Sequence, residues 1–215
     1  MIKIFENDFI EAEFYMKDEE PSILEGVPHV KPSQVHGNKI LVVNASNIAE
    51  YSFPNRPEAD GILLTSRNSQ ASLRFADCAP VLIWDNDCVM LLHSGYKGTV
   101  LNICSEGIKL FPPERINSLM AWIGACIGRK FYGRNLENDE WTLKGLTEFH
   151  PENYDRKGDK VFFDLAGEIK SQLLECGLKN ENIILSGIDT MTDFRCYSYR
   201  RGDKTERMTL LAKLK

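Results

Sequence analysis

The chain has 215 residues, a hydrophobic content of 43%, a charged content of 27% and a formal net charge of -5. These values are typical of a globular protein with a buried core, and they give no support for a nucleic-acid-binding surface because no lysine- or arginine-dense stripe offsets the negative charge. The start of the chain lacks a charged segment followed by an apolar run, and no stretch approaches the roughly 18 apolar residues of a membrane span. We therefore expect a soluble, cytoplasmic protein with no nucleic-acid or membrane partner.

Strands dominate the first half of the chain. Apolar residues alternate with more polar ones over residues 10–16, and a β-branched run follows at Ile40–Val43. The proline-containing segment Tyr51–Glu58 predicts a loop. Four short strand candidates then follow in close succession, and Asp85-Asn86-Asp87 is typical of a hairpin turn between the last two: Ile62–Thr65, Ala71–Phe75, Val81–Trp84 and Val89–Leu92. We expect this dense run to form the centre of the sheet.

Two helices are predicted. One covers Thr99–Leu110 and ends before two prolines. The other begins after the capping residue Asp164, and apolar residues recur along it as far as Leu178. Between them, Leu119–Ile123 predicts a strand, and residues 129–160 are polar and irregular. The tail pairs Ile183–Leu185 with a later alternating segment at 208–212. No linker divides the chain, so we predict an α/β fold in a single domain over residues 1–215.

Three turn-rich motifs each carry one candidate metal ligand. Two imidazoles and one thiolate form a ligand set for zinc that leaves a fourth position open for water or substrate, as in catalytic sites. The ligands are 42 and 15 residues apart in sequence, which is not a zinc-finger spacing, so spacing alone is a weak signal. The motifs are Gln34-Val35-His36-Gly37, Ala76-Asp77-Cys78-Ala79-Pro80 and His93-Ser94-Gly95-Tyr96-Lys97-Gly98.

Further motifs stand between and after these three in a characteristic order. They are Ala59-Asp60-Gly61 between the first two, then Ile123-Gly124-Ala125-Cys126-Ile127-Gly128 and Tyr197-Ser198-Tyr199-Arg200-Arg201. From about Gln34 to the C-terminus, the chain resembles the laccase-domain or multicopper polyphenol oxidoreductase family, whose members are described as zinc-dependent purine nucleoside phosphorylases. The resemblance implies mixed β-sheets flanked by helices and His36, Cys78 and His93 as the metal ligands.

The resemblance also implies an activity. Members split purine nucleosides with phosphate, so a small-molecule nucleoside and phosphate are the expected partners. Adenosine deamination is a second activity of the family, and some members are linked to peptidoglycan editing. The chain departs from the family at three places: Tyr96-Lys97 stands for Trp-Arg, Arg129 to Gly133 stands for Pro-Cys-Cys-Tyr-Glu, and the short stretch Asp18–Val30 replaces an N-terminal block of longer relatives.

Phosphorolysis requires cations to bind the anionic nucleophile. Lys97 and Arg200 are the candidates for a catalytic role, and Arg74 and Arg201 are the candidates for binding substrate or phosphate. Arg200 and Arg201 are also compatible with a solvated hairpin end. Asp77 either holds a ligand imidazole in one tautomer, acts as an acid/base group, or caps nearby backbone amides as a turn residue.

Other function classes compete with the phosphorylase. In a thiol enzyme, Cys78 is the nucleophile and His93 or His36 its base. A copper-dependent polyphenol oxidase would use the same cluster, but copper sites of this kind require a weak axial ligand, usually methionine. Met90 lies three residues from His93, which places it on the opposite face of a strand. A non-enzymatic module binds metal or a partner without turnover. Zinc is the expected cofactor and copper the alternative.

Overall fold

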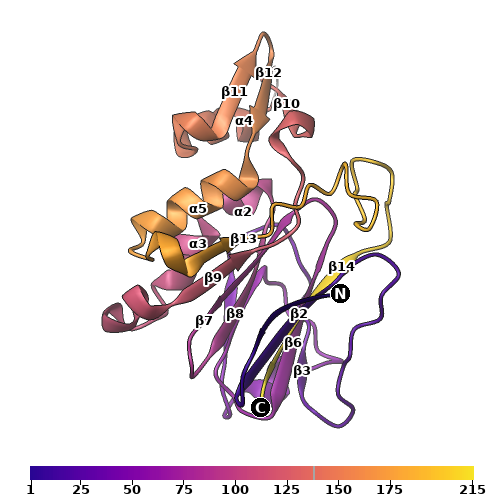
Figure 1. Ribbon diagram of the computed structural model, residues 1–215, viewed down its shortest axis with the longest axis vertical. Coiled ribbons are helices and arrows are strands. Elements are labelled where there is room, and N and C mark those ends of the chain that lie inside the picture. The colour runs from indigo at the N-terminus through magenta and orange to yellow at the C-terminus, as the bar shows by residue number, and fades with distance from the viewer. Residues whose placement is uncertain (138) are drawn as a thin grey trace.

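The computed structural model describes residues 1–137 and 139–215, and it places two large sheets face to face with helices on one side (Figure 1). The first sheet has five strands, in which β3 is parallel to β6 and the other pairs are antiparallel. In spatial order the strands are β1 (Ile2–Glu6), β2 (Ile10–Tyr15), β14 (Met208–Leu214), β6 (Ser69–Phe75) and β3 (His29–Val30).

The second sheet has six strands and is mixed. Its two outer pairs are parallel and its inner pairs are antiparallel. The spatial order is β13 (Ile183–Leu185), β9 (Met120–Ile123), β7 (Ala79–Trp84), β8 (Val89–Ser94), β5 (Gly61–Leu64) and β4 (Ile40–Val43). The mixed sheets and flanking helices confirm the predicted α/β class.

The six-stranded sheet is buried on both faces, because it lies between the five-stranded sheet and the helices. In β7, Leu82 packs toward the other sheet, whereas Val81 and Ile83 belong to the core under the helices. The continuous apolar runs of these strands are the sequence signature of such double burial. The helices on the outer face are α2 (Tyr96–Val100), α3 (Ile103–Ile108) and α5 (Leu165–Glu175).

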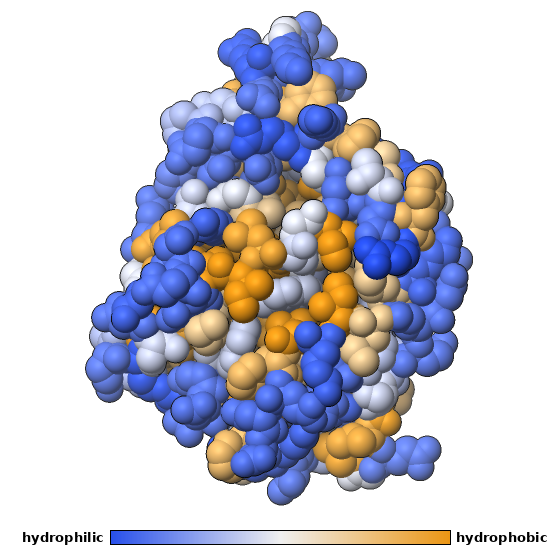
Figure 2. All heavy atoms as spheres, viewed as in Figure 1, coloured by the Kyte–Doolittle hydropathy of each residue, from blue (hydrophilic) through white to orange (hydrophobic). Residues whose placement is uncertain are grey.

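A small antiparallel sheet forms a separate lobe above the helices (Figure 1). Polar residues cover much of its surface in Figure 2, while non-polar residues gather lower on the same face. The lobe contains β10 (Gly133–Asn135), β12 (Lys160–Phe163), β11 (Tyr154–Lys157) and α4 (Glu140–Glu148). The remaining helical turns are α1 (Ile48–Tyr51) and the 3-10 helices Pro113–Ser118, Arg129–Phe131, Pro151–Asn153 and Asn180–Asn182. None of the described helices has the length and apolar character needed to cross a membrane.

Most predicted strands and the Asp164-capped helix are confirmed, but four expectations change. The dense run of strands divides between two sheets, because β6 pairs with β14 instead of joining β5, β7 and β8. The tail segments β13 and β14 do not pair with each other; β13 pairs with β9. Residues 129–160 hold most of the small lobe. The helix predicted at 99–110 is split in two, because Asn102 adopts a left-handed conformation with φ 51° and caps α3 by accepting a hydrogen bond from the Ser105 amide.

Candidate metal centre

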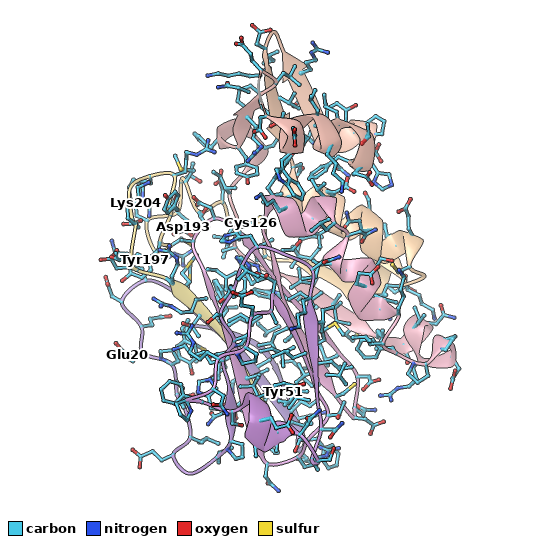
Figure 3. The ribbon with its side chains drawn as sticks, turned by 180° about the vertical axis from the view of Figure 1, so that it is seen from behind. Glu20, Tyr51, Cys126, Asp193, Tyr197 and Lys204 are labelled. Carbon is cyan, nitrogen blue, oxygen red and sulfur yellow. The ribbon has the colours of Figure 1, made fainter. Side chains whose placement is uncertain are left out.

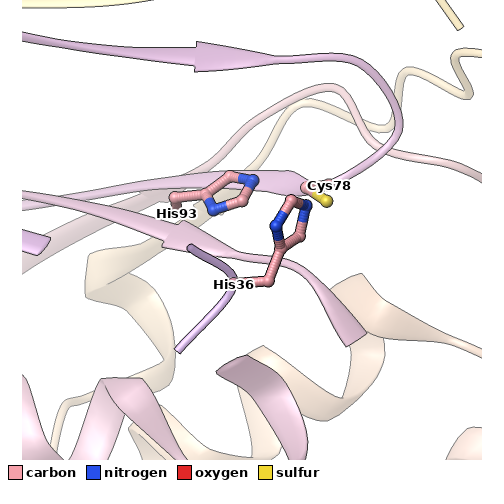
Figure 4. A group of neighbouring side chains, drawn as sticks. All are labelled: His36, Cys78 and His93. Atoms are coloured by element: carbon pink, nitrogen blue, oxygen red, sulfur yellow. The ribbon is translucent and has the colours of Figure 1, made fainter. Parts of the chain in front are cut away.

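The three predicted ligands converge. His36, Cys78 and His93 each offer one ligand atom, and these atoms lie within 4.8 Å of one another (Figure 4). His36 comes from the loop between β3 and β4, Cys78 from the turn between β6 and β7, and His93 from β8. His36 is exposed, Cys78 is half-buried and His93 is buried. The site is therefore open to solvent on the His36 side, and its donor set fits a divalent metal ion.

Asp60 organises this cluster from beneath. Its fully buried carboxylate accepts a hydrogen bond from Nδ1 of His93 at 2.8 Å. Burial opposes its ionisation, yet the hydrogen bond from His93 and the amide of Gly37 keep the pKa of Asp60 below its ordinary value. Because this carboxylate accepts, Nδ1 of His93 donates, and Nε2 is the nitrogen left for a metal.

The same carboxylate shapes the loop that carries His36. The backbone amides of Val35, His36 and Gly37 donate to Asp60 at 3.2, 3.0 and 2.7 Å. Three donors converging on one anion hold His36 in a left-handed conformation with φ 61°, which is uncommon for a residue with a side chain. One buried carboxylate thus fixes two of the three ligands.

Gly95 lets the first turn of α2 close over the cluster. A Cβ atom at this position would lie 2.7 Å from Sγ of Cys78 and 3.3 Å from Cδ2 of His36. Both distances are shorter than ordinary van der Waals contact, so the close approach requires glycine. The glycine of this motif has a steric role next to the ligands.

The cluster changes the acid–base properties of its members. Burial raises the pKa of the Cys78 thiol, but the charge of His93 and hydrogen bonds from His36 and His93 outweigh it and lower that pKa to about 6. Burial lowers the pKa of His93, but the Cys78 thiolate and Asp60 outweigh it and raise that pKa to about 9. Both shifts favour the thiolate form of Cys78 and the imidazolium form of His93. The other cysteines differ, since burial raises the pKa of Cys88, Cys126 and Cys196 to about 12 and also raises those of Cys104 and Cys176.

Asp77 lies next to Cys78 but does not hold an imidazole. Its carboxylate accepts hydrogen bonds from the Thr190 hydroxyl at 2.6 Å and from the Arg200 amide at 2.7 Å. The orienting role considered for Asp77 belongs to Asp60 in the structure, because Asp77, with φ 80°, bonds instead to the loop between β13 and β14. Contact with a backbone amide agrees with the capping alternative.

The four predicted cations lie in different surroundings. Lys97 is exposed on α2, with Nζ 4.9 Å from the centre of the Trp141 ring. Arg200 is exposed and donates from Nη1 to the Phe131 carbonyl at 2.8 Å. Its guanidinium lies 5.5 Å from the centre of the Tyr132 ring. Lys97 lies two residues after Gly95, and the backbone amide of Arg200 donates to Asp77, the neighbour of Cys78.

Arg74 and Arg201 are less directly connected. Arg74 is exposed on β6, and its side chain donates to the Thr205 carbonyl at 3.5 Å. Arg201 donates to the Thr190 carbonyl at 2.8 Å and pairs with Asp203 at 3.2 Å. These contacts stabilise the loop before β14, on which Asp193, Tyr197 and Lys204 are seen in Figure 3. Arg201 therefore uses its guanidinium within the loop.

Sequence reasoning missed two residues near the ligands. Asp60 stands in the motif Ala59-Asp60-Gly61, and an acidic residue directly before a buried strand was the available signal. Tyr132 lies in the segment that departs from the family pattern. Burial raises the pKa of its hydroxyl, and the nearby Cys78 thiolate raises it further. No sequence pattern indicates this electrostatic influence, because Tyr132 and Cys78 are far apart in the chain.

A family model described as multi-copper polyphenol oxidoreductase laccase matches residues 22–215. A purine nucleoside phosphorylase of Rickettsia conorii is 29% identical over 182 residues, covering 79% of this chain and 68% of that protein. A purine nucleoside phosphorylase of Aquifex aeolicus is 27% identical over 184 residues, covering 82% and 78%.

Solved structures share the fold. The hypothetical protein YfiH of Bacillus licheniformis superposes with a TM-score of 0.77 at 22% identity, covering 96% of this chain and 93% of that one. YlmD of Geobacillus stearothermophilus gives a TM-score of 0.76 at 24% identity, covering 87% and 74%. The likeness to YfiH extends over nearly the whole of both chains, so the fold is found in a solved protein of similar extent.

Proposed function

The chain belongs to the multi-copper polyphenol oxidoreductase laccase family, and from this premise we propose that it is a purine nucleoside phosphorylase with a zinc centre at His36, Cys78 and His93. The relatives from Rickettsia and Aquifex both carry the name purine nucleoside phosphorylase. The single observation that carries the proposal for this chain is the convergence of two imidazoles and one thiolate, with Asp60 orienting His93.

Zinc is the preferred metal because the three-ligand set matches catalytic zinc sites, in which the ion keeps an open position for an oxygen or nitrogen ligand and acts as a Lewis acid. A copper site of the blue-copper type would need a weak axial ligand, and Met90 is the methionine nearest in sequence to a ligand. Met90 packs in the core under the helices, on the face of β8 opposite to the one that packs against the other sheet, so it does not serve as an axial ligand.

The reaction joins a phosphate oxygen to C1′ of the ribose while the bond between C1′ and the purine nitrogen breaks. The chain must bind a phosphate anion beside the sugar and hold the leaving base. Lys97 and Arg200 are the cations that we assign to phosphate, with Arg74 as a further candidate. Asp77 acts as a positioning residue for this purpose, since its carboxylate fixes the Arg200 amide at 2.7 Å.

Product analysis by liquid chromatography tests the proposal. Zinc-loaded protein is incubated with adenosine or inosine, with and without phosphate. Free base and ribose 1-phosphate are expected only with phosphate, and the Cys78→Ala variant should be inactive, whereas Cys176→Ala, at a half-buried cysteine outside the cluster, should retain activity. Inosine formed from adenosine would establish deaminase activity, which we propose as a second reaction. No conversion of either nucleoside by zinc-loaded protein would overturn the phosphorylase assignment.

A thiol enzyme is the second candidate, and the lowered pKa of Cys78 favours it. In that case Cys78 is the nucleophile and His93 is the proton donor to the leaving group. Burial lowers the pKa of His93, but the negative charge of Cys78 and the hydrogen bond to Asp60 outweigh it and raise that pKa. Metal-free protein separates the two functions. Activity that persists with a chelator and is abolished by alkylation of Cys78 supports the thiol enzyme, and activity that a chelator removes and zinc restores supports the metal enzyme.

A further inference from the structure

A hollow lies between the small lobe and the loop that leads to β14. Its volume is about 570 Å³, and three cations, two phenylalanine rings and a methionine line it: Lys130, Lys160, Arg200, Phe131, Phe162 and Met191. Among the residues that the structure describes, its lining includes no aspartate or glutamate. The lining therefore combines positive charge with non-polar side chains.

The cations in this hollow are available to a ligand. Lys130 and Lys160 are exposed, and neither forms an ion pair with any residue in 1–137 or 139–215. Arg200 uses one guanidinium nitrogen for the Phe131 carbonyl, which leaves further donors. Three like charges around one hollow repel one another, and a bound anion relieves that repulsion. A phosphate group, with up to two negative charges and several acceptor oxygens, matches three such donors better than a single carboxylate does.

The phenylalanine rings and the volume of the hollow indicate what the ligand carries besides a phosphate group. Phe131 has 37% of its surface exposed, so its ring is accessible, and Phe162 on β12 is partly buried. Exposed aromatic rings beside cations are a common platform for nucleobases, because every base has a flat face that stacks. The volume falls within the range of about 300–1,000 Å³ that is usual for small-molecule sites and greatly exceeds the needs of an inorganic phosphate ion.

We propose that this hollow binds a mononucleotide, with its phosphate at Lys130, Lys160 and Arg200 and its base against Phe131 and Phe162. Arg200 connects this site with the metal centre, since its amide is bound by Asp77, the neighbour of Cys78. Arg200 is shared with the phosphate site of the proposed phosphorylase, whereas Lys130 and Lys160 belong to this hollow alone, so substitutions at the two lysines test the hollow separately. Arg129 to Gly133, where this chain departs from the family pattern, supplies three of the lining residues.

Isothermal titration of the zinc-loaded protein tests the proposal without any measurement of turnover. Adenosine 5′-monophosphate, adenosine and inorganic phosphate are titrated separately. The nucleotide should bind more tightly than either of the others, and its affinity should fall as salt is raised. The double substitution Lys130→Gln with Lys160→Gln should weaken nucleotide binding about tenfold and leave adenosine binding unchanged.

Lys179→Gln is the matched control, since Lys179 is an exposed lysine outside the hollow. It should leave all three affinities unchanged. Phe162→Leu, which keeps a non-polar side chain on β12, should weaken the nucleotide but not inorganic phosphate. Equal affinities for the nucleotide and adenosine, or a double variant that binds the nucleotide like the unaltered protein, would overturn the site. Binding of inorganic phosphate as tight as that of the nucleotide would overturn the nucleotide assignment.

Discussion

At the scale of single residues, Asp60 has the largest influence on the metal centre. It connects one ligand side chain, His93, with the backbone of the loop that presents another, His36. A carboxylate partner of this kind fixes the ring orientation of a ligand histidine and makes it a better donor. The contribution of Asp60 is therefore to hold the ligands before the metal arrives.

Replacing Asp60 by Asn should lower zinc affinity by about 10- to 100-fold, because the amide is uncharged and loses its attraction for His93. A competition titration against a chromophoric chelator measures this change. Glu168→Gln is the control, since Glu168 is a fully buried, hydrogen-bonded carboxylate outside the cluster. If Asp60→Asn binds zinc as tightly as the unaltered chain, Asp60 has no part in orienting the ligands.

Gly95 offers a purely steric test. Its φ of -77° suits alanine, but a Cβ atom there would lie 2.7 Å from Sγ of Cys78. Overpacking of this kind costs about 1–3 kcal/mol, so Gly95→Ala should lower zinc affinity about tenfold or more while the circular dichroism spectrum stays native. In Gly37→Ala the added Cβ atom makes an ordinary contact of 3.6 Å with Asp60, and zinc affinity should change much less. Similar losses in both variants would show that space around Sγ is not the limiting factor.

At the scale of elements, a polar network attaches the small lobe to α5. Glu168 is fully buried on α5 and accepts hydrogen bonds from the His150 amide at 2.9 Å and from Asn153 at 3.0 Å. The ring of His150 lies between Glu168 at 3.1 Å and Glu175 at 3.0 Å. The position of α5 relative to the lobe thus depends on one imidazole between two carboxylates.

This network should give the stability of the protein a pH dependence. The hydrogen bond to Glu175 raises the pKa of His150 above its ordinary 6.5, and Glu168 adds to the effect against partial desolvation. The stabilisation from the imidazolium is therefore complete below pH 6.5 and is lost as the pH rises through the raised value. His150→Gln should lower the melting temperature more at pH 6 than at pH 9, as measured by differential scanning calorimetry.

His29 supplies the control for this pH dependence. Burial, with a smaller contribution from Lys31, lowers the pKa of His29 to about 4, so its ring is neutral at both pH values. His29→Gln should therefore change the melting temperature by a similar amount at pH 6 and pH 9. A His150 variant that behaves in the same way would show that the charge of the imidazole does not stabilise the fold.

At the scale of the whole molecule, local patterns predict elements better than they predict partners. The alternation around Phe14 and the apolar run from Val81 to Trp84 identify strands, because side-chain burial imposes those patterns directly. Which strands share a sheet depends on contacts between distant residues, so the run that includes β6 divides between two sheets without any signal in the sequence.

The candidate site shows the same division. The ligand types stand in recognisable motifs, so His36, Cys78 and His93 are found from the sequence. The role of Asp60 requires knowing that β5 begins beneath the His36 loop, which only the pairing of β5 with β4 and β8 establishes. The hollow at Lys130 and Lys160 is lined mainly by the lobe, and the polar sequence of residues 129–160 gives no element pattern. The apolar residues of the lobe are buried through contacts with distant residues such as Tyr96 and Val100, which the local sequence does not reveal.

The location of the ligands makes metal binding a property of the whole fold. His36 follows β3 and Cys78 follows β6, both in the five-stranded sheet, while His93 belongs to β8 in the six-stranded sheet. An ion held by all three joins the two sheets, and an unfolded chain does not keep the three together.

A metal that binds only the folded state, at a free concentration a thousand times its dissociation constant, adds about 4 kcal/mol of stability. For a chain of this size, that raises the melting temperature by about 8–16 °C. Calorimetry with and without zinc should show this rise in the unaltered protein and in Cys176→Ala but not in Cys78→Ala. A rise of equal size in Cys78→Ala would place the stabilising metal elsewhere, and the cluster would then not be the site that couples zinc to the fold.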